Sequence, residues 1–148
     1  MSYALSVEIF GAGLTPEEPS HWGLVINIPP SQIGDLLHVR TLDPMRGFFQ
    51  FEPRFGTKLV TQQAYGLCAL SRLSDQQRRQ AAQIITAEKA PTDGKRNCQD
   101  WIFSALLSLE IEELVPAGTS GFWKVMIGKP AEYIKTAMGA NWVDLRSL

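Results

Sequence analysis

The chain has 148 residues, of which 45% are hydrophobic and 20% charged, a composition typical of one globular domain with an apolar core. Its net charge of −1 offers no basic surface for nucleic acid, and no apolar run reaches the ~18 residues that span a bilayer. We therefore expect a single domain over residues 1–148, with no nucleic-acid partner and no integral membrane segment.

Cysteine and histidine are scarce in this chain. The cysteines are Cys68 and Cys98, and the histidines are His21 and His38. Two cysteines are too few for a disulfide scaffold, although one bridge between them stays open, and a zinc site with four ligands would need all four residues. The N-terminus also lacks the basic region and apolar segment of a secretory signal. These features favour a cytoplasmic protein without a metal or another cofactor.

The first half of the chain has the pattern of β-strands. Apolar and polar residues alternate from Tyr3 to Phe10, and glycines then end the pattern. Three further segments are rich in β-branched and aromatic residues and follow at hairpin-like spacing, at residues 21–28, 35–40 and 47–52. They predict an antiparallel meander. Residues 58–73 are compatible with either a strand or the edge of a helix.

The second half is helical. Ser74, followed by Gln77, matches a capping box and predicts a helix that ends at Glu88. Apolar residues at three- and four-residue steps predict a buried helix over residues 98–114, and Pro130 precedes a short helix over residues 131–138. Together with the strands, these helices predict an α+β fold in which a small antiparallel sheet packs against helices.

Cys98 directly follows Asn97, a favourable N-cap residue, and therefore opens the second predicted helix. A helix N-terminus points backbone N–H groups and a positive dipole at such a sulfur, which lowers a thiol pKa. Lys95 and Arg96 would add to this effect if they lie near the sulfur. We therefore expect Cys98 to be a nucleophile of lowered pKa, whereas Cys68, within an apolar run, is expected to be a buried hydrophobic residue.

A catalytic thiol also needs a base that accepts and returns its proton, and histidine suits this role. His21 begins one predicted strand and His38 lies near the end of the next, so a hairpin brings them to the same corner of the sheet. One can serve as the base while the other orients it. Asp35 and Asp43 lie near His38 in sequence, but we expect them to cap turns or to stay solvated.

The order of these residues resembles a known family. The chain has His21-Trp22-Gly23, then His38-Val39, then Asn97-Cys98-Gln99-Asp100-Trp101. This is similar to the circularly permuted papain-like enzymes of the lecithin retinol acyltransferase type, whose pattern is H-W-A, a second H, and N-C-E-H-F. Over about residues 20 to 115, the resemblance implies a permuted papain-like fold in which the histidine strands precede the cysteine helix. It implies Cys98 as the nucleophile, His21 as the general base and His38 as the orienting residue.

The sequence therefore predicts a thiol-protease-like hydrolase or acyltransferase that forms an acyl-enzyme on Cys98 from a small-molecule or peptide acyl substrate. Two other functions stay open on the same fold. One is a non-catalytic module that binds a ligand or peptide, and the other is a biosynthetic cyclase or isomerase with His21 as its base. We expect Trp22 and Trp101, beside the proposed site residues, to belong to the core.

Overall fold

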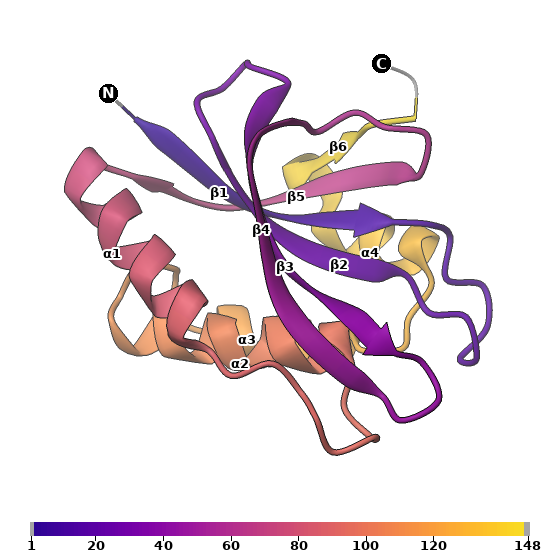
Figure 1. Ribbon diagram of the computed structural model, residues 1–148. Coiled ribbons are helices and arrows are strands. Elements are labelled where there is room, and N and C mark those ends of the chain that lie inside the picture. The colour runs from indigo at the N-terminus through magenta and orange to yellow at the C-terminus, as the bar shows by residue number, and fades with distance from the viewer. Residues whose placement is uncertain (1, 147–148) are drawn as a thin grey trace.

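Six strands and four α-helices form the chain over residues 2–146, the part that the computed structural model describes (Figure 1). The protein is thus an α+β protein. Its elements, in chain order, are β1 (Tyr3–Phe10), β2 (His21–Asn27), β3 (Ile33–Asp43), β4 (Phe48–Lys58), β5 (Ala64–Leu73), α1 (Asp75–Ala87), α2 (Cys98–Ile111), α3 (Thr119–Met126), α4 (Ala131–Met138), a 3₁₀ turn (Gly139–Asn141) and β6 (Trp142–Asp144). Over these residues, no helix combines the length and the apolar character that crossing a bilayer requires.

The strands form one antiparallel sheet in the order β4-β3-β2-β1-β5-β6. The meander predicted from the hairpin spacing is confirmed for β1 to β4. The ambiguous segment, residues 58–73, contains β5, which pairs with the free edge of β1 instead of extending the meander. Figure 1 shows α1, α2 and α3 grouped on one side of this sheet.

Side-chain alternation along β1 separates two buried faces of the sheet. Leu5, Val7 and Ile9 point toward the helices, where they join the main core with residues of α2. The opposite face holds a smaller cluster centred on Val25, Leu36 and Leu59. Both faces of the central strands therefore carry buried apolar residues. The face to which a site residue points decides which of the two clusters it lies near.

Local capping explains where the predicted helices begin and end. The capping box between Ser74 and Gln77 is present at the start of α1. Helix α2 ends at Ile111, before the predicted boundary, because Glu113 adopts a left-handed conformation with φ of 59°. The N–H of Leu114 then donates to the carbonyl of Leu109, at 2.9 Å. Leu114 stays in the core after the helix has ended, which explains why its apolar character suggested a longer helix.

Two elements near the C-terminus are absent from the sequence prediction. Helix α3 begins after Gly118, whose φ of 93° reverses the chain, and it buries Trp123. The other element is β6, whose three residues are too few to give a periodic signal. Its Trp142 pairs with Cys68 on β5, which joins the C-terminal segment to the sheet.

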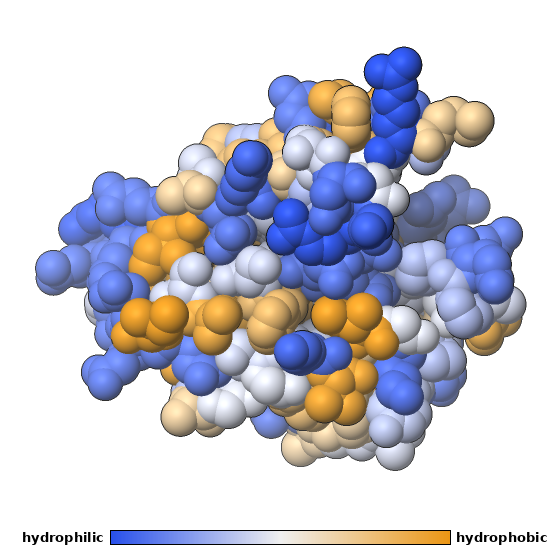
Figure 2. All heavy atoms as spheres, turned by 90° about the horizontal axis from the view of Figure 1, so that it is seen from below, coloured by the Kyte–Doolittle hydropathy of each residue, from blue (hydrophilic) through white to orange (hydrophobic). Residues whose placement is uncertain are grey.

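The outer surface of the helices carries some apolar side chains. Figure 2 views the molecule from below Figure 1 and shows apolar residues in separate groups between hydrophilic ones. The most exposed apolar residues of α2 and α3 are Leu107, Ile111 and Val125. Scattered exposed residues of this kind are ordinary on protein surfaces.

Candidate active site

The first turn of α2 holds Cys98 in a fixed position. The side chain of Asn97 accepts a hydrogen bond from the backbone N–H of Gln99, and Asp100 accepts one from that of Asn97, both at 2.9 Å. The predicted N-cap is thus confirmed as a reciprocal capping box. Cys98 follows directly and is only 7% exposed.

The side chain of Gln99 connects this turn to the strand that begins with His21. Its Nε2 donates to the carbonyl of Ser20 at 2.9 Å, and its Oε1 accepts from the N–H of Gly128 at 2.8 Å. Gln99 is 1% exposed, so both bonds are shielded from water. Gln99 therefore holds the start of α2 against the start of β2. The sequence signal for this role was an amide in the first turn of an otherwise apolar helix.

The two histidines meet as the sequence predicted. Nε2 of His21, the first residue of β2, lies 2.8 Å from Nδ1 of His38 on β3. The two rings are nearly perpendicular, at 71°, with centroids 5.0 Å apart. The hairpin between β2 and β3 produces this contact because it turns the two side chains to the same side of the sheet.

A third residue, Glu52, extends the pair into a chain. Nε2 of His38 lies 3.2 Å from Oε1 of Glu52, the residue directly opposite it on β4. Arg40 and Arg54 each donate to this carboxylate at 2.8 Å. Sequence reasoning missed Glu52, although the predicted adjacency of its strand to that of His38 was the signal that could have found it.

The aspartates near His38 serve other purposes, and the expected turn-capping role is confirmed for Asp43 alone. Asp35 accepts a hydrogen bond from the backbone N–H of Gly56, at 3.0 Å, and Asp43 accepts one from that of Met45, at 3.0 Å. Asp43 therefore caps a turn, whereas Asp35, inside β3, accepts a hydrogen bond from the paired strand β4, and neither orients a histidine.

Electrostatics fix the charge of each member of the chain. The Arg40 guanidinium, with Arg54, lowers the pKa of Glu52 to about 2. Burial lowers the pKa of His21 to about 4, and the neighbouring His38 adds to this effect. Burial also lowers the pKa of His38, although Glu52 opposes it. At neutral pH, Glu52 is therefore a carboxylate and both imidazoles are neutral.

These charges assign the hydrogens in the chain. A carboxylate only accepts, so Nε2 of His38 must carry the hydrogen that it donates to Glu52. Neutral His38 then accepts at Nδ1, and Nε2 of His21 donates to it. The lone pair of His21 is consequently on Nδ1, which has no hydrogen-bond partner among residues 2–146. Glu52 thus determines, through His38, which nitrogen of His21 can accept a proton.

Cys98 lies near this chain but does not contact His21 through a hydrogen bond in the described structure. Pairing between β2 and β3 stops at Leu24 and Leu37, and beyond this point the strands separate. A cavity of about 400 Å³ occupies the gap, with His21 and Cys98 both in its lining. Alternation directs Trp22 toward the helices and His21 toward the opposite face. The two histidines are therefore in direct contact, whereas Cys98 and His21 share only the lining of one cavity.

The expectation of a lowered Cys98 pKa is wrong. Burial raises the pKa of this thiol, although the backbone N–H groups of Trp22, Gln99 and Cys98 itself oppose the shift. Desolvation outweighs the helix N-terminus because the sulfur is withdrawn from water. The two basic residues upstream, Lys95 and Arg96, are exposed, and Arg96 pairs with Asp93 at 2.9 Å. Cys98 is therefore a neutral thiol at neutral pH.

The remaining cysteine and the flanking tryptophans belong to the core, as expected. Cys68 is fully buried, Trp22 is fully buried, and Trp101 is 1% exposed. Cys68 and Cys98 are both free thiols. Within the described residues, no three His, Cys, Asp or Glu side chains are grouped so as to hold a metal ion.

Fold and site together define an α+β protein that has a cysteine at a helix N-terminus and a hydrogen-bonded His-His-Glu triplet. The polypeptide chain belongs to a family of unknown function (DUF6540), whose model matches residues 10–116. This range includes His21, His38, Glu52 and Cys98. No curated protein and no solved structure matches the chain.

Proposed function

We propose that the protein is a thiol hydrolase or acyltransferase of permuted papain-like arrangement, which forms an acyl-enzyme on Cys98. Two observations carry this proposal: the hydrogen bonds from His21 through His38 to Glu52 leave the Nδ1 lone pair of His21 without a partner among the described residues, and one cavity has both His21 and Cys98 in its lining. A nucleophile, a base and a group that orients the base are the parts that nucleophilic catalysis requires.

The reaction begins from a neutral thiol and a neutral imidazole, because the pKa of Cys98 is raised and that of His21 is lowered to about 4. Because His21 points toward the sheet face opposite the helices, its side chain must turn toward the cavity when an acyl substrate enters, so that Nδ1 reaches the thiol of Cys98. Nδ1 takes the thiol proton while the sulfur bonds to the acyl carbon. Glu52 stabilises the resulting imidazolium through His38.

The later steps use the same groups. The N–H groups around the sulfur, those of Trp22 and Gln99 among them, stabilise the oxyanion that forms on the acyl oxygen. His21 then returns its proton to the leaving group, which departs and leaves a thioester on Cys98. Water or another acceptor attacks this thioester, gives its proton to His21, and releases the acyl group. The thiol is restored when His21 protonates the sulfur.

Intact-protein mass spectrometry after incubation with libraries of acyl-thioesters and acyl-esters tests the proposal. We expect an added acyl mass on Cys98, absent from Cys98→Ala and retained in Cys68→Ala, a matched control for the other thiol. His21→Ala should abolish the adduct, and His38→Ala should slow its formation. Absence of an adduct from every library member, in protein shown to be folded, contradicts the proposal.

A second candidate is a non-catalytic binding module. Two observations favour it, namely the raised pKa of Cys98 and the lack of a hydrogen bond between this thiol and His21 in the described structure. This function predicts saturable binding of a ligand in the cavity without covalent transfer. Equal affinity of Cys98→Ser and the unaltered protein, with no adduct in either, would favour the binding module.

A further inference from the structure

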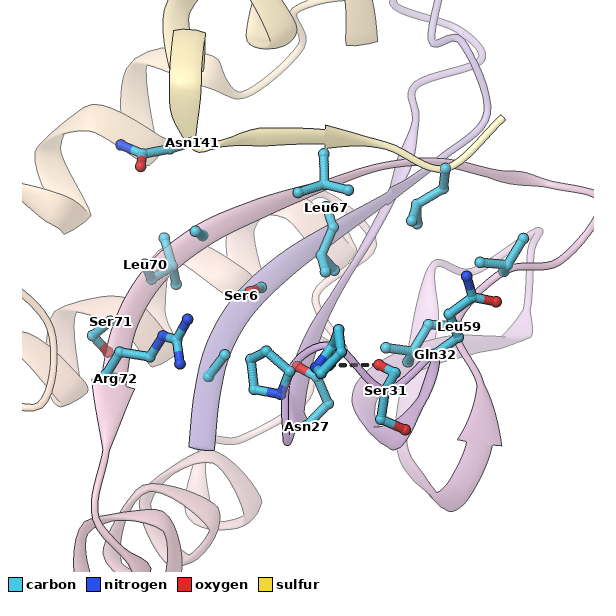
Figure 3. Close-up of a pocket in the computed structure, with 17 residues that line it drawn as sticks. Ser6, Asn27, Ser31, Gln32, Leu59, Leu67, Leu70, Ser71, Arg72 and Asn141 are labelled. Carbon is cyan, nitrogen blue, oxygen red and sulfur yellow. Dashed lines mark hydrogen bonds between the residues drawn. The ribbon is translucent and has the colours of Figure 1, made fainter. Parts of the chain in front are cut away.

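A larger cavity, of about 580 Å³, lies on the sheet face opposite the main core (Figure 3). Its lining contains none of Cys98, His21, His38 or Glu52. Apolar side chains form most of its wall, among them Leu59, Val60, Leu67, Val143 and Leu145. Its volume is in the range of small-molecule sites, which are mostly apolar with a few polar groups that fix orientation.

Small residues on the central strands create this hollow. Ala4 of β1 lies between Asn27 of β2 and Arg72 of β5, and the three form one row across the sheet. In the next row, Ser6 of β1 pairs with Ala69 of β5. Figure 3 shows Ser6 on this floor, between Arg72 on one side and Asn27 on the other. Two strand spacings separate Asn27 from Arg72, a backbone distance of roughly 10 Å.

Asn27 provides an acceptor that the protein itself does not use. Its Nδ2 donates to the carbonyl of Ser31 at 2.9 Å, which orients the amide. Its Oδ1 is buried and has no hydrogen-bond partner among the described residues, and the residue is only 8% exposed. A buried acceptor without a partner is unfavourable, so a bound N–H or O–H group would stabilise this site.

Arg72 provides the charge. No salt bridge to Arg72 is present among residues 2–146, and no acidic side chain lines the cavity. Figure 3 shows its side chain extending from β5 toward β1. A guanidinium at the edge of an apolar hollow favours a carboxylate, which it can bind with two parallel hydrogen bonds.

We propose that this cavity binds a small amphipathic carboxylate of the N-acyl amino acid type. The acyl chain occupies the apolar wall, the amide N–H donates to Oδ1 of Asn27, and the carboxylate binds Arg72. This proposal is independent of the chemistry proposed for Cys98, because the two sites share no lining residue.

Isothermal titration calorimetry with three matched probes tests the proposal. N-decanoylglycine has all three features, its methyl ester lacks the carboxylate, and N-decanoylsarcosine lacks the amide N–H. We expect saturable binding of N-decanoylglycine and at least about tenfold weaker binding of the ester, since a charge-assisted hydrogen bond contributes about this factor. The sarcosine derivative should also bind more weakly.

Substitutions in the protein test which residue is responsible for each loss of affinity. Arg72→Leu should weaken binding of the acid about tenfold and leave binding of the ester unchanged, whereas Arg46→Leu, at another exposed arginine, should change neither. Ala69→Leu, an exposed position on the floor, should abolish binding of all three probes by filling the hollow. Cys98→Ala should bind N-decanoylglycine as the unaltered protein does.

Several results would overturn the proposal. They are the absence of saturable binding, equal affinities of the acid and its ester, or loss of binding in Cys98→Ala, which would assign the ligand to the other cavity. If Ala69→Leu does not fold, the comparison of the acid with the ester in Arg72→Leu decides, because that position is exposed.

Discussion

Nε2 of His21 lies 2.8 Å from Nδ1 of His38, and this contact determines which nitrogen of His21 can accept a proton. Because neutral His38 donates its single N–H, at Nε2, to Glu52, its Nδ1 accepts the N–H of His21, and the lone pair of His21 is on Nδ1. The carboxylate of Glu52 therefore determines which nitrogen of His21 acts as the base, although it does not contact His21. Glu52 is thus a positioning residue.

Replacing Glu52 with glutamine should disturb this arrangement. The neutral amide does not require a donor at Nε2 of His38, so we expect both tautomers of each histidine to become populated. Nitrogen-15 chemical shifts of the imidazoles measure this change directly. Formation of the acyl adduct on Cys98 should slow by about 10- to 100-fold, since acid–base catalysis contributes factors of this size.

Asp35→Asn is the matched control for Glu52→Gln. Asp35 lies on the same strand as His38 and accepts a hydrogen bond from the N–H of Gly56, but does not contact either histidine. This variant should leave the imidazole shifts unchanged. Unchanged shifts in Glu52→Gln as well would show that the carboxylate does not select the tautomer.

The raised pKa of Cys98 predicts an unusual pH profile for alkylation. Because the thiolate is the reactive form and burial raises the pKa of this thiol above its ordinary 9.0, the rate with iodoacetamide should still increase at pH 9. At pH 7 the thiol should react more slowly than free cysteine. Mass spectrometry of quenched samples measures both rates, and Cys68→Ala removes any contribution from the other thiol.

A rate that reaches its plateau below pH 8 would contradict this expectation. It would show that the N–H groups of Trp22, Gln99 and Cys98 outweigh desolvation in solution. The proposed reaction would then begin from a thiolate instead of a neutral thiol.

Gln99 should be important for stability. Gln99→Leu removes the hydrogen bonds to the carbonyl of Ser20 and the N–H of Gly128, and leaves both backbone groups without their partner. We expect the free energy of unfolding to fall by roughly 2–4 kcal/mol, as measured by urea denaturation. Gln83→Leu, at an exposed position of α1, should change it by less than about 0.5 kcal/mol. Similar values for the two variants would refute the anchoring role.

Glu8 makes stability depend on pH. This residue of β1 is 1% exposed, its Oε2 has no hydrogen-bond partner among the described residues, and burial raises its pKa from 4.5 to about 8. The folded state therefore keeps a proton that the unfolded state loses above pH 4.5. The stabilising effect of this proton is complete below pH 4.5 and is lost as pH rises toward 8, at about 1.4 kcal/mol per pH unit.

The histidines act in the opposite direction at lower pH. The pKa of His21 is lowered from 6.5 to about 4, so its contribution to stability grows as pH rises through that interval. The effect of Glu8 is therefore best isolated between pH 6.5 and 8. There the unaltered protein should lose stability as pH rises, and Glu8→Gln should show a smaller slope in thermal unfolding. Glu17→Gln, at an exposed glutamate, should retain the full slope. Equal slopes in all three proteins would contradict a buried, protonated Glu8.

Much of the fold followed from the sequence because its signals are local. Alternation located β1 and β-branched and aromatic content located β2, each to within a residue, and the caps at Ser74 and Asn97 located the starts of α1 and α2. Where a boundary depended on distant contacts, the prediction failed. The end of α2 and the three-residue strand β6 are examples, because each depends on packing that no short window of sequence contains.

For the site, the sequence by itself determined that Cys98 opens a helix and that His21 and His38 meet, since an N-cap and a hairpin are local structures. Only the tertiary structure decided that Glu52 completes the chain and that the pKa of Cys98 is raised. The first depends on the register between β3 and β4, and the second on burial, which the local pattern around Asn97 does not report. Burial and register are produced by residues far apart in the chain, and here they determine the chemistry available to the thiol.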